Sequence, residues 1–409
     1  MTKSTYTPPA AILEKYANLL VEFGLQSRDG TVAKPGSVVH FIVPEAARPL
    51  YFYLQKAILR HGHHPMGEYL PSSDEIYNFE SNFFSEASAE QRVFELTKFK
   101  KGQVDQADCV IRIFADTLPH GLKKIPAEHI LAHRRGQKKS IDYKWKKIDD
   151  DKLFWTLALY GTEAMAKEAG MSLKAYWQQI IKACYLDSKN PTKEWFKIND
   201  TVQGVAKRLT DMQIQCLHWL GEDVDLTVGL GSNRVWLAGG GNNIPSFEVF
   251  TSPNWREVDG WVRFNQPLYV FGNMIEGIEL WFEKGVVVKS KATKNHKLLR
   301  QIIETKGGDH LGEISLTDRR LSRITKFMAD TLYDENTGGE FGNTHMALGA
   351  CFHDCYKGPA PKNEKAWDTL GYNDSVVHHD IVSTTDRTVT ATLLDGTSKV
   401  IYKKGQFVI

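Results

Sequence analysis

The stretch SVVHFIV, at residues 37–43, is rich in β-branched and aromatic side chains and predicts a buried strand. Residues 49–61 follow with apolar side chains at helical spacing, and ADCVIRIF at 107–114 predicts a second buried strand. A further helix is expected over residues 9–23. Strands that alternate with helices in this way are typical of an α/β domain with a mainly parallel sheet.

The pattern changes after about residue 209, where short alternating runs separated by turns replace the helical spacing. Lys284-Gly285 and Asp395-Gly396 each separate two β-rich runs, and both turns predict hairpins. Two helices, over residues 294–305 and 318–332, are expected to interrupt this half. The second half is therefore predicted to be a mixed α+β domain with a largely antiparallel sheet.

The length of the chain agrees with two domains. Its 409 residues exceed the size at which a single hydrophobic core stops growing. We predict an α/β N-terminal domain over residues 1–206 and an α+β C-terminal, metal-binding catalytic domain over residues 207–409.

The charge balance and the cysteine content disfavour several classes of protein. Lysine and arginine total 51 against 49 for aspartate and glutamate, so we expect no nucleic-acid partner and no binding to an anionic membrane. No apolar stretch approaches the ~20 residues of a spanning helix, and the N-terminal residues lack the apolar block of a signal peptide. The five scattered cysteines suit reduced thiols in the cytoplasm.

The second half also carries acidic and histidine residues inside apolar runs. A buried carboxylate is unfavourable unless it is paired or bound to a metal. Taken singly, such a glutamate is more often on an exposed face, and such a histidine is more often a hydrogen-bonded core residue. The candidates are Glu248 in SFEVFTSP, Glu313 in HLGEISL, Glu340 and His345 in GGEFGNTHMALG, and His378 and Asp380 in VVHHDIV.

Convergence of these side chains would form a site for two divalent metal ions, although spacing alone leaves the convergence open. Carboxylates combined with two imidazoles suit Zn²⁺, Co²⁺ or Mn²⁺. Two such ions activate a water molecule and stabilise a tetrahedral intermediate. The residue types therefore predict hydrolase chemistry.

At these positions the chain resembles the thermophilic-aminopeptidase family of two-metal exopeptidases. The similarity covers most of the chain and is most specific in NNIPSFEVFTSP, GDHLGEISL, TLYDEN, THMALG and NDSVVHHDIV, which follow the order of the family's motifs. The resemblance implies a metalloaminopeptidase that acts on peptides with a free N-terminus and that forms a homodimer.

The resemblance also implies a role for each residue. The metal ligands would be Glu248, Glu313, His345, His378 and Asp380, with Glu313 bridging the two ions. For a further glutamate ligand, Glu340 matches by its distance from His345, whereas Glu335 matches by its neighbours in TLYDEN. We favour Glu340, and we expect Glu313 or Glu340 to orient or deprotonate the nucleophile.

One position departs from the family. A tyrosine usually follows the A-L-G segment, but this chain has Phe352 there, and Tyr356 is the nearest substitute for a catalytic hydroxyl. The departure keeps open an alternative, a non-catalytic peptide-binding protein on the same fold. A two-metal phosphoesterase is a third interpretation, which the lack of an arginine or lysine clamp among these motifs disfavours.

Overall fold

The computed structural model describes residues 5–26, 30–359 and 361–409. The chain divides into two compact units, which we call the first and second unit. The first unit comprises Met1–Asn199, Gly239–Ser246 and Phe327–Tyr333, and the second comprises Asp200–Ala238, Phe247–Lys326 and Asp334–Ile409. The domain boundary at residue 206 stays a prediction.

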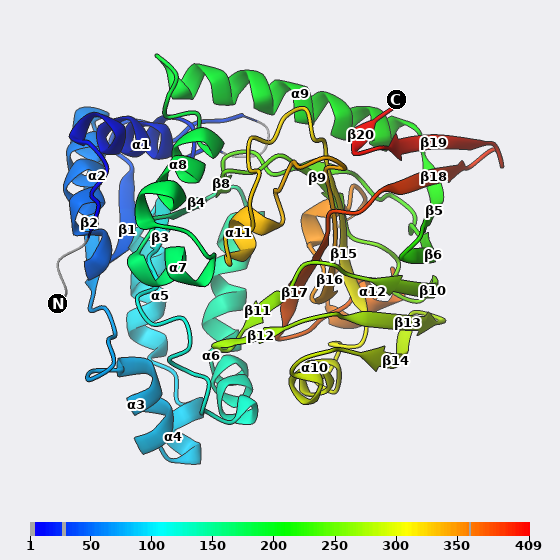
Figure 1. Cartoon of the computed structure of the whole chain (residues 1–409), viewed down its shortest axis with the longest axis horizontal. Coiled ribbons are helices and arrows are strands. Elements are labelled where there is room, and N and C mark those ends of the chain that lie inside the picture. Colours follow the sequence, from blue (N-terminus) through cyan, green and yellow to red (C-terminus); the bar gives the residue numbers. More distant parts are fainter. Residues whose placement is uncertain (1–4, 27–29, 360) are drawn as a thin grey trace. The chain divides into compact units, whose positions relative to one another are not determined.

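The first unit is built on a five-stranded sheet of order β2-β1-β3-β4-β8, in which all neighbouring strands are parallel (Figure 1). The strands are β1 (Val38–Pro44), β2 (His64–Leu70), β3 (Cys109–Phe114), β4 (Phe154–Leu159) and β8 (Asn243–Ile244). Both predicted strands are present, because their β-branched and aromatic side chains fill the core: Val39, Phe41 and Ile111 are fully buried.

Helices connect these strands. Ser172 accepts a hydrogen bond from the backbone N–H of Ala175 and so begins a helix, because the first turn of a helix leaves donors unsatisfied. The helices are α1 (Ala10–Glu22), η1 (Glu45–Ala47), α2 (Arg48–Arg60), α3 (Phe79–Glu86), α4 (Ala89–Val93), α5 (Thr97–Gln106), α6 (Ala127–Asp149), α7 (Glu163–Glu168), α8 (Leu173–Ala183) and α9 (Pro191–Asp211), the last of which continues into the second unit. The predicted helices over 9–23 and 49–61 correspond to α1 and α2.

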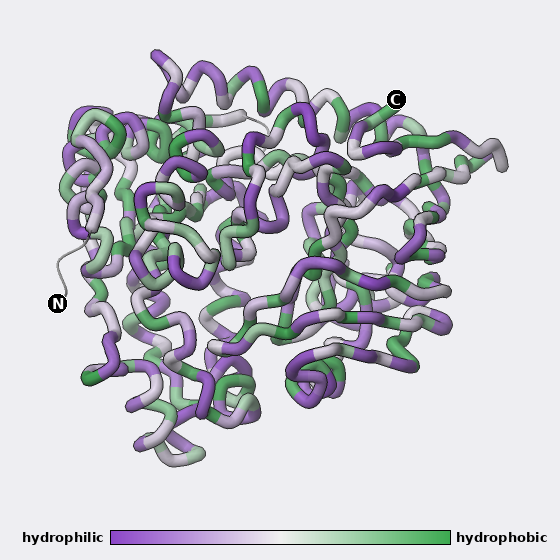
Figure 2. The backbone as a smooth tube through the Cα atoms, viewed as in Figure 1, coloured by the Kyte–Doolittle hydropathy of each residue, from purple (hydrophilic) through white to green (hydrophobic). Residues whose placement is uncertain are grey.

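The second unit contains an eight-stranded antiparallel sheet of order β14-β13-β10-β6-β5-β18-β19-β20. Its strands are β5 (Ile214–Gly221), β6 (Val224–Gly229), β10 (Val258–Arg263), β13 (Glu279–Glu283), β14 (Val286–Lys291), β18 (Arg387–Leu393), β19 (Ser398–Lys403) and β20 (Gln406–Phe407). Both predicted hairpins are confirmed, since β13 pairs with β14 and β18 pairs with β19. Hydrophobic and hydrophilic residues follow one another along these strands (Figure 2), as expected for a sheet with one buried face.

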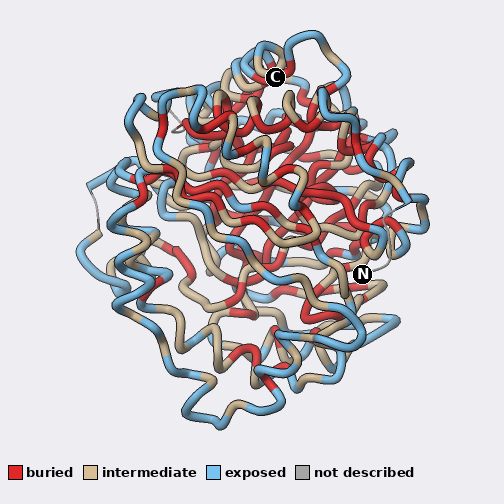
Figure 3. Tube along the Cα trace, turned by 90° about the vertical axis from the view of Figure 1, so that its left-hand side faces the viewer, coloured by how far each residue is buried: buried red, intermediate tan, exposed pale blue. Residues whose placement is uncertain are grey.

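A second antiparallel sheet, of order β17-β16-β15-β9-β7, holds the candidate site. Its strands are β7 (Leu237–Ala238), β9 (Glu248–Thr251), β15 (Leu311–Thr317), β16 (Asn343–Gly349) and β17 (His378–Ser383). The three central strands, β9, β15 and β16, are buried along their whole length. Figure 3 shows buried residues in red. The remaining elements are β11 (Leu268–Val270), β12 (Asn273–Ile275), α10 (His296–Ile303), α11 (Thr331–Asp334), η2 (His353–Cys355) and α12 (Glu364–Thr369).

The predicted helix over residues 318–332 is wrong. The carboxylate of Asp318 accepts hydrogen bonds from the backbone N–H of Arg320 and from its side chain, which turns the chain at the end of β15. Irregular chain follows until Thr331, where the short helix α11 begins. The predicted helix over 294–305 is confirmed as α10.

Among the described residues, no helix is long and apolar enough to cross a membrane.

Candidate metal centre

Five predicted site residues lie on one face of the second antiparallel sheet. Asp380 pairs in register with Ala347, and Ala347 pairs with Glu313, so Asp380 and Glu313 point to the same side. His345 lies two residues before Ala347 and shares that face. The same alternation brings Glu248, at the start of β9, and His378, at the start of β17, to this side of the sheet.

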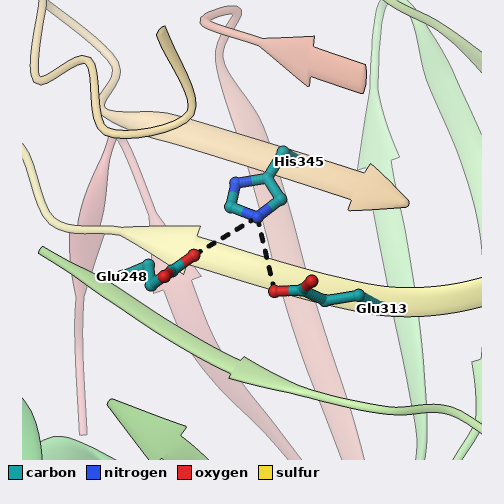
Figure 4. Close-up of side chains that lie close together, drawn as sticks. All are labelled: Glu248, Glu313 and His345. Atoms are coloured by element: carbon teal, nitrogen blue, oxygen red, sulfur yellow. Dashed lines mark ion pairs between the residues drawn. The ribbon is translucent and has the colours of Figure 1, made fainter. Parts of the chain in front are cut away.

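The side-chain atoms of these residues converge. His345 Nε2 lies 3.4 Å from Glu248 Oε2, 3.5 Å from Glu313 Oε1 and 3.9 Å from Asp380 Oδ1. Figure 4 shows Glu248 and Glu313 pointing toward His345 from neighbouring strands. His378 Nε2 lies 3.1 Å from Glu313 Oε2 and 3.3 Å from Asp380 Oδ1. Glu313 therefore directs one oxygen to each imidazole.

The geometry fits a divalent metal ion. His345 is 1% exposed, and within the described chain neither of its ring nitrogens makes a hydrogen bond; Asp380 Oδ1 makes none either. Charge-assisted hydrogen bonds are about 2.7–2.9 Å long, shorter than the separations around His345 Nε2. Two donor atoms that each lie about 2.1 Å from one tetrahedral ion are about 3.4 Å apart, which matches the spacing of Glu248, Glu313 and His345.

The charges of the cluster are interdependent. Burial alone would lower the pKa of His345, but its carboxylate neighbours, Glu313 first, raise it to about 9. The pKa of His378 is likewise raised well above its usual value by Asp380 and Glu313, against the effect of burial. Burial alone would raise the pKa values of Glu313 and Asp380, but the two imidazoles lower both. Positive charge is therefore required among these buried carboxylates, whether from protonated imidazoles or from a metal.

A backbone carbonyl fixes the orientation of His378. Nδ1 of His378 lies 2.8 Å from the carbonyl oxygen of Ala350, to which it donates. In the neutral imidazole this bond leaves Nε2, which faces Glu313 and Asp380, as the nitrogen whose lone pair can bind a metal. No sequence signal identifies this contact, because any residue at position 350 offers the same carbonyl.

The structure separates the two glutamates between which the sequence left a choice. Glu335 is 6% exposed and joins His345 and Asp380 in a third group that can hold a metal ion. Glu340, by contrast, is exposed in the turn before β16, and among the described residues it belongs to none of these groups. The preference for Glu340, which relied on its distance from His345 along the chain, stays a prediction, and the burial of Glu335 favours the other glutamate.

Phe352, and not Tyr356, lies against the cluster. The ring of Phe352 is 5.0 Å from the ring of His378 and 5.5 Å from that of Phe250. Tyr356 instead packs in an aromatic group, 5.6 Å from Trp367 and 6.1 Å from Tyr372. The structure therefore does not bring Tyr356 together with the five candidate ligands.

Buried carboxylates and imidazoles that converge on one face of the sheet β17-β16-β15-β9-β7 form the kind of ligand set that a metal-dependent hydrolase uses. The comparison with known proteins makes this specific. The chain belongs to the thermophilic metalloprotease family M29, whose sequence profile matches residues 10–407.

Individual relatives agree with this membership. The chain is 28% identical to aminopeptidase PepS of Streptococcus thermophilus over 97% of this chain and 98% of that protein. It is 28% identical to aminopeptidase T of Thermus aquaticus over 71% of this chain and 74% of the relative. The solved structure of wild-type AmpT from Thermus thermophilus has the same fold, with a TM-score of 0.80 at 23% identity over 97% of this chain and 99% of that one.

Proposed function

We propose that the protein is a metal-dependent aminopeptidase that releases N-terminal residues from peptides. The observation that carries the proposal is the position of Glu313, which directs its two oxygens to the imidazoles of His345 and His378. Membership of a metalloprotease family and the names of the relatives support the same activity.

We assign the metal site to six residues. Glu313 belongs to two of the groups of potential ligands, so the set suits two ions that share this carboxylate. Nitrogen and carboxylate donors of this kind suit Zn²⁺, Co²⁺ or Mn²⁺. The proposed ligands are Glu248, Glu313, Glu335, His345, His378 and Asp380, so Glu335 replaces Glu340.

The bound ions would supply Lewis acidity, which lowers the pKa of water toward ~7 and polarises the scissile carbonyl. Either Glu313 or Glu335 would orient the attacking water and accept its proton. Carboxylates of the same cluster would also bind the α-ammonium group of the substrate, which explains removal of residues from a free N-terminus. The exposed Glu340, and Tyr356, which packs near Trp367 and Tyr372, have no part in this assignment.

In the test, a chelator first removes bound metal from the protein, and separate samples are then reconstituted with Zn²⁺, Co²⁺ or Mn²⁺. Hydrolysis of leucyl and arginyl p-nitroanilides is expected to return with metal and to be absent in Glu313→Ala. The phenylalanine at position 352, where the family has a tyrosine, is the reason to keep one alternative, a peptide-binding protein without catalysis. Tight peptide binding without turnover under every metal would establish that alternative. Hydrolysis of a phosphodiester instead would establish a phosphoesterase.

We further propose a homodimer in the cytoplasm. All five cysteines are free thiols, which suits a reducing compartment. Between residues 76 and 99, eight large apolar side chains are more than a third exposed, and such apolar surface is typical of association sites. They are Ile76, Tyr77, Phe79, Phe83, Val93, Phe94, Leu96 and Phe99. Light scattering after gel filtration would give the mass of a dimer, and a monomeric mass at micromolar concentration would contradict it.

A further inference from the structure

A buried ion pair lies within the second unit, on the opposite face of the sheet from the candidate metal centre. Arg387, the first residue of β18, is 1% exposed, and Asp223, between β5 and β6, is 8% exposed. Arg387 Nε donates to Asp223 Oδ1 at 3.0 Å, and Nη2 donates to Oδ2 at 3.1 Å. This bidentate geometry defines the direction of both side chains, because the planar guanidinium fits a carboxylate in one orientation.

The pair is bonded to both strands that carry the candidate imidazoles. Arg387 Nη1 donates to the hydroxyl of Thr344 on β16 at 3.0 Å. Asp223 Oδ2 accepts hydrogen bonds from Ser383, the last residue of β17, at 3.3 Å and from Thr385 at 2.8 Å. Thr344 and Ser383 are partners in the register of β16 and β17, so the ion pair connects the two strands at one point.

These contacts lie on the opposite face of the sheet from the candidate ligands. Thr344 directly precedes His345, and successive side chains of a strand point to opposite faces. Ser383 is an odd number of residues from Asp380 and therefore also points away from the cluster. Arg387 thus touches no candidate ligand, and any influence on the site passes through the backbones of β16 and β17.

We propose that Arg387, held by Asp223, is a positioning residue that sets β16 against β17 and thereby the spacing between His345 and the pair His378 and Asp380. The inference rests on the proposed function, since it concerns the same metal centre. A buried ion pair contributes little net stability compared with apolar side chains of the same volume, so we infer that its role here is to select one arrangement of its partners. Here the selected arrangement is that of the two strands whose side chains must meet around the ions.

The experiment measures Co²⁺ binding to the chelated full-length protein, by the visible absorption of Co²⁺ and by competition with a chelator. Asp223→Asn removes the charge that holds Arg387, and we expect Co²⁺ affinity to fall about tenfold or more, with a changed spectrum. The kcat for leucyl p-nitroanilide should fall while KM changes little. A wild-type affinity and spectrum in Asp223→Asn would overturn the inference.

Asp318→Asn is the matched control. Asp318 is 2% exposed and also pairs with an arginine, Arg320, but its further hydrogen bonds are to the backbone N–H groups of Arg320 and of Phe407 on β20. We expect it to lower the melting temperature with Co²⁺ affinity unchanged, and an equal loss of affinity in both variants would show that the effect is not specific to β16 and β17.

Thr344→Val covers the case in which Asp223→Asn does not fold, because it removes one hydroxyl and keeps the ion pair. It should weaken Co²⁺ binding in a protein that still folds, with a lower melting temperature because Arg387 Nη1 loses its acceptor. Unchanged binding would overturn the inference. Wild-type protein that binds no Co²⁺ would overturn the proposed function together with this inference, which distinguishes the two failures.

Discussion

The ring of Phe352 packs edge-on against the imidazole of His378, with ring centroids 5.0 Å apart. The residue that lacks a hydroxyl therefore lies directly beside a candidate metal ligand. Tyr356, the nearest tyrosine along the chain, is in a different aromatic group and does not supply the missing hydroxyl to this position.

Phe352→Tyr is expected to raise kcat for leucyl p-nitroanilide about a hundredfold, at the low end of the range for a group that assists proton transfer. The added hydroxyl would lie next to His378, where it can polarise the substrate carbonyl. Steady-state kinetics on the metal-loaded enzyme measures the effect. Phe352→Leu, which adds no hydroxyl, should not raise kcat, and an equal gain in both variants would contradict the explanation.

Glu335→Gln and Glu340→Gln form a matched pair that tests the further ligand. Glu335 is buried beside His345 and Asp380, so loss of its charge should weaken metal binding at least about tenfold. Glu340 is exposed, and its substitution should leave metal binding and activity within twofold of wild type. Isothermal titration of chelated protein with Zn²⁺ checks both. The reverse order of effects would restore Glu340 as the ligand.

Glu313→Gln is expected to lower kcat by about 10²–10⁴-fold, the range for loss of a group that handles protons in the transition state. The amide keeps the shape of the side chain but cannot accept a proton or bridge two cations. Metal analysis of the dialysed variant should also show fewer bound ions per chain. Full activity at wild-type metal content would remove Glu313 from the mechanism.

Asp330 predicts a pH dependence of stability that is independent of the metal ligands. Burial, together with the charge of Asp116, raises the pKa of Asp330 to about 7, although backbone hydrogen bonds at Leu332 and Tyr333 act in the opposite direction. At pH values between about 4, the pKa of an aspartate in the unfolded chain, and about 7, the folded chain holds a proton on Asp330 that the unfolded chain has lost. The contribution of Asp330 to the free energy of unfolding is therefore largest below about pH 4 and is lost as the pH rises through about 7.

Asp330→Asn should consequently stabilise the protein at pH 8 by about 2–4 kcal/mol and should have little effect at pH 4. Denaturant unfolding at the two pH values measures the difference. Asp211→Asn, at an exposed position on α9, is the control and should show no such dependence. A gain in stability that is equal at both pH values would contradict the titration of Asp330.

The sequence by itself determined the local elements and the residue types of the site. Buried strands such as residues 37–43 and hairpins such as Lys284-Gly285 were predictable, because β-branched runs and left-handed turn residues favour one backbone conformation locally. The family motifs identified Glu248, Glu313, His345, His378 and Asp380 as candidates. The predicted helix over 318–332 failed because the carboxylate of Asp318 competes for backbone donors, which helical spacing does not reveal.

Only the tertiary structure decided which of these side chains meet. Glu313 and Asp380 are 67 positions apart in the sequence, yet the register of β15, β16 and β17 brings them to one row of the sheet. The burial of Glu335 beside His345 and Asp380, the contact of Phe352 with His378 and the ion pair of Arg387 with Asp223 are likewise contacts that appear only in the folded chain. Strand register is a property of long-range hydrogen bonding and burial, and for that reason spacing along the chain does not contain it.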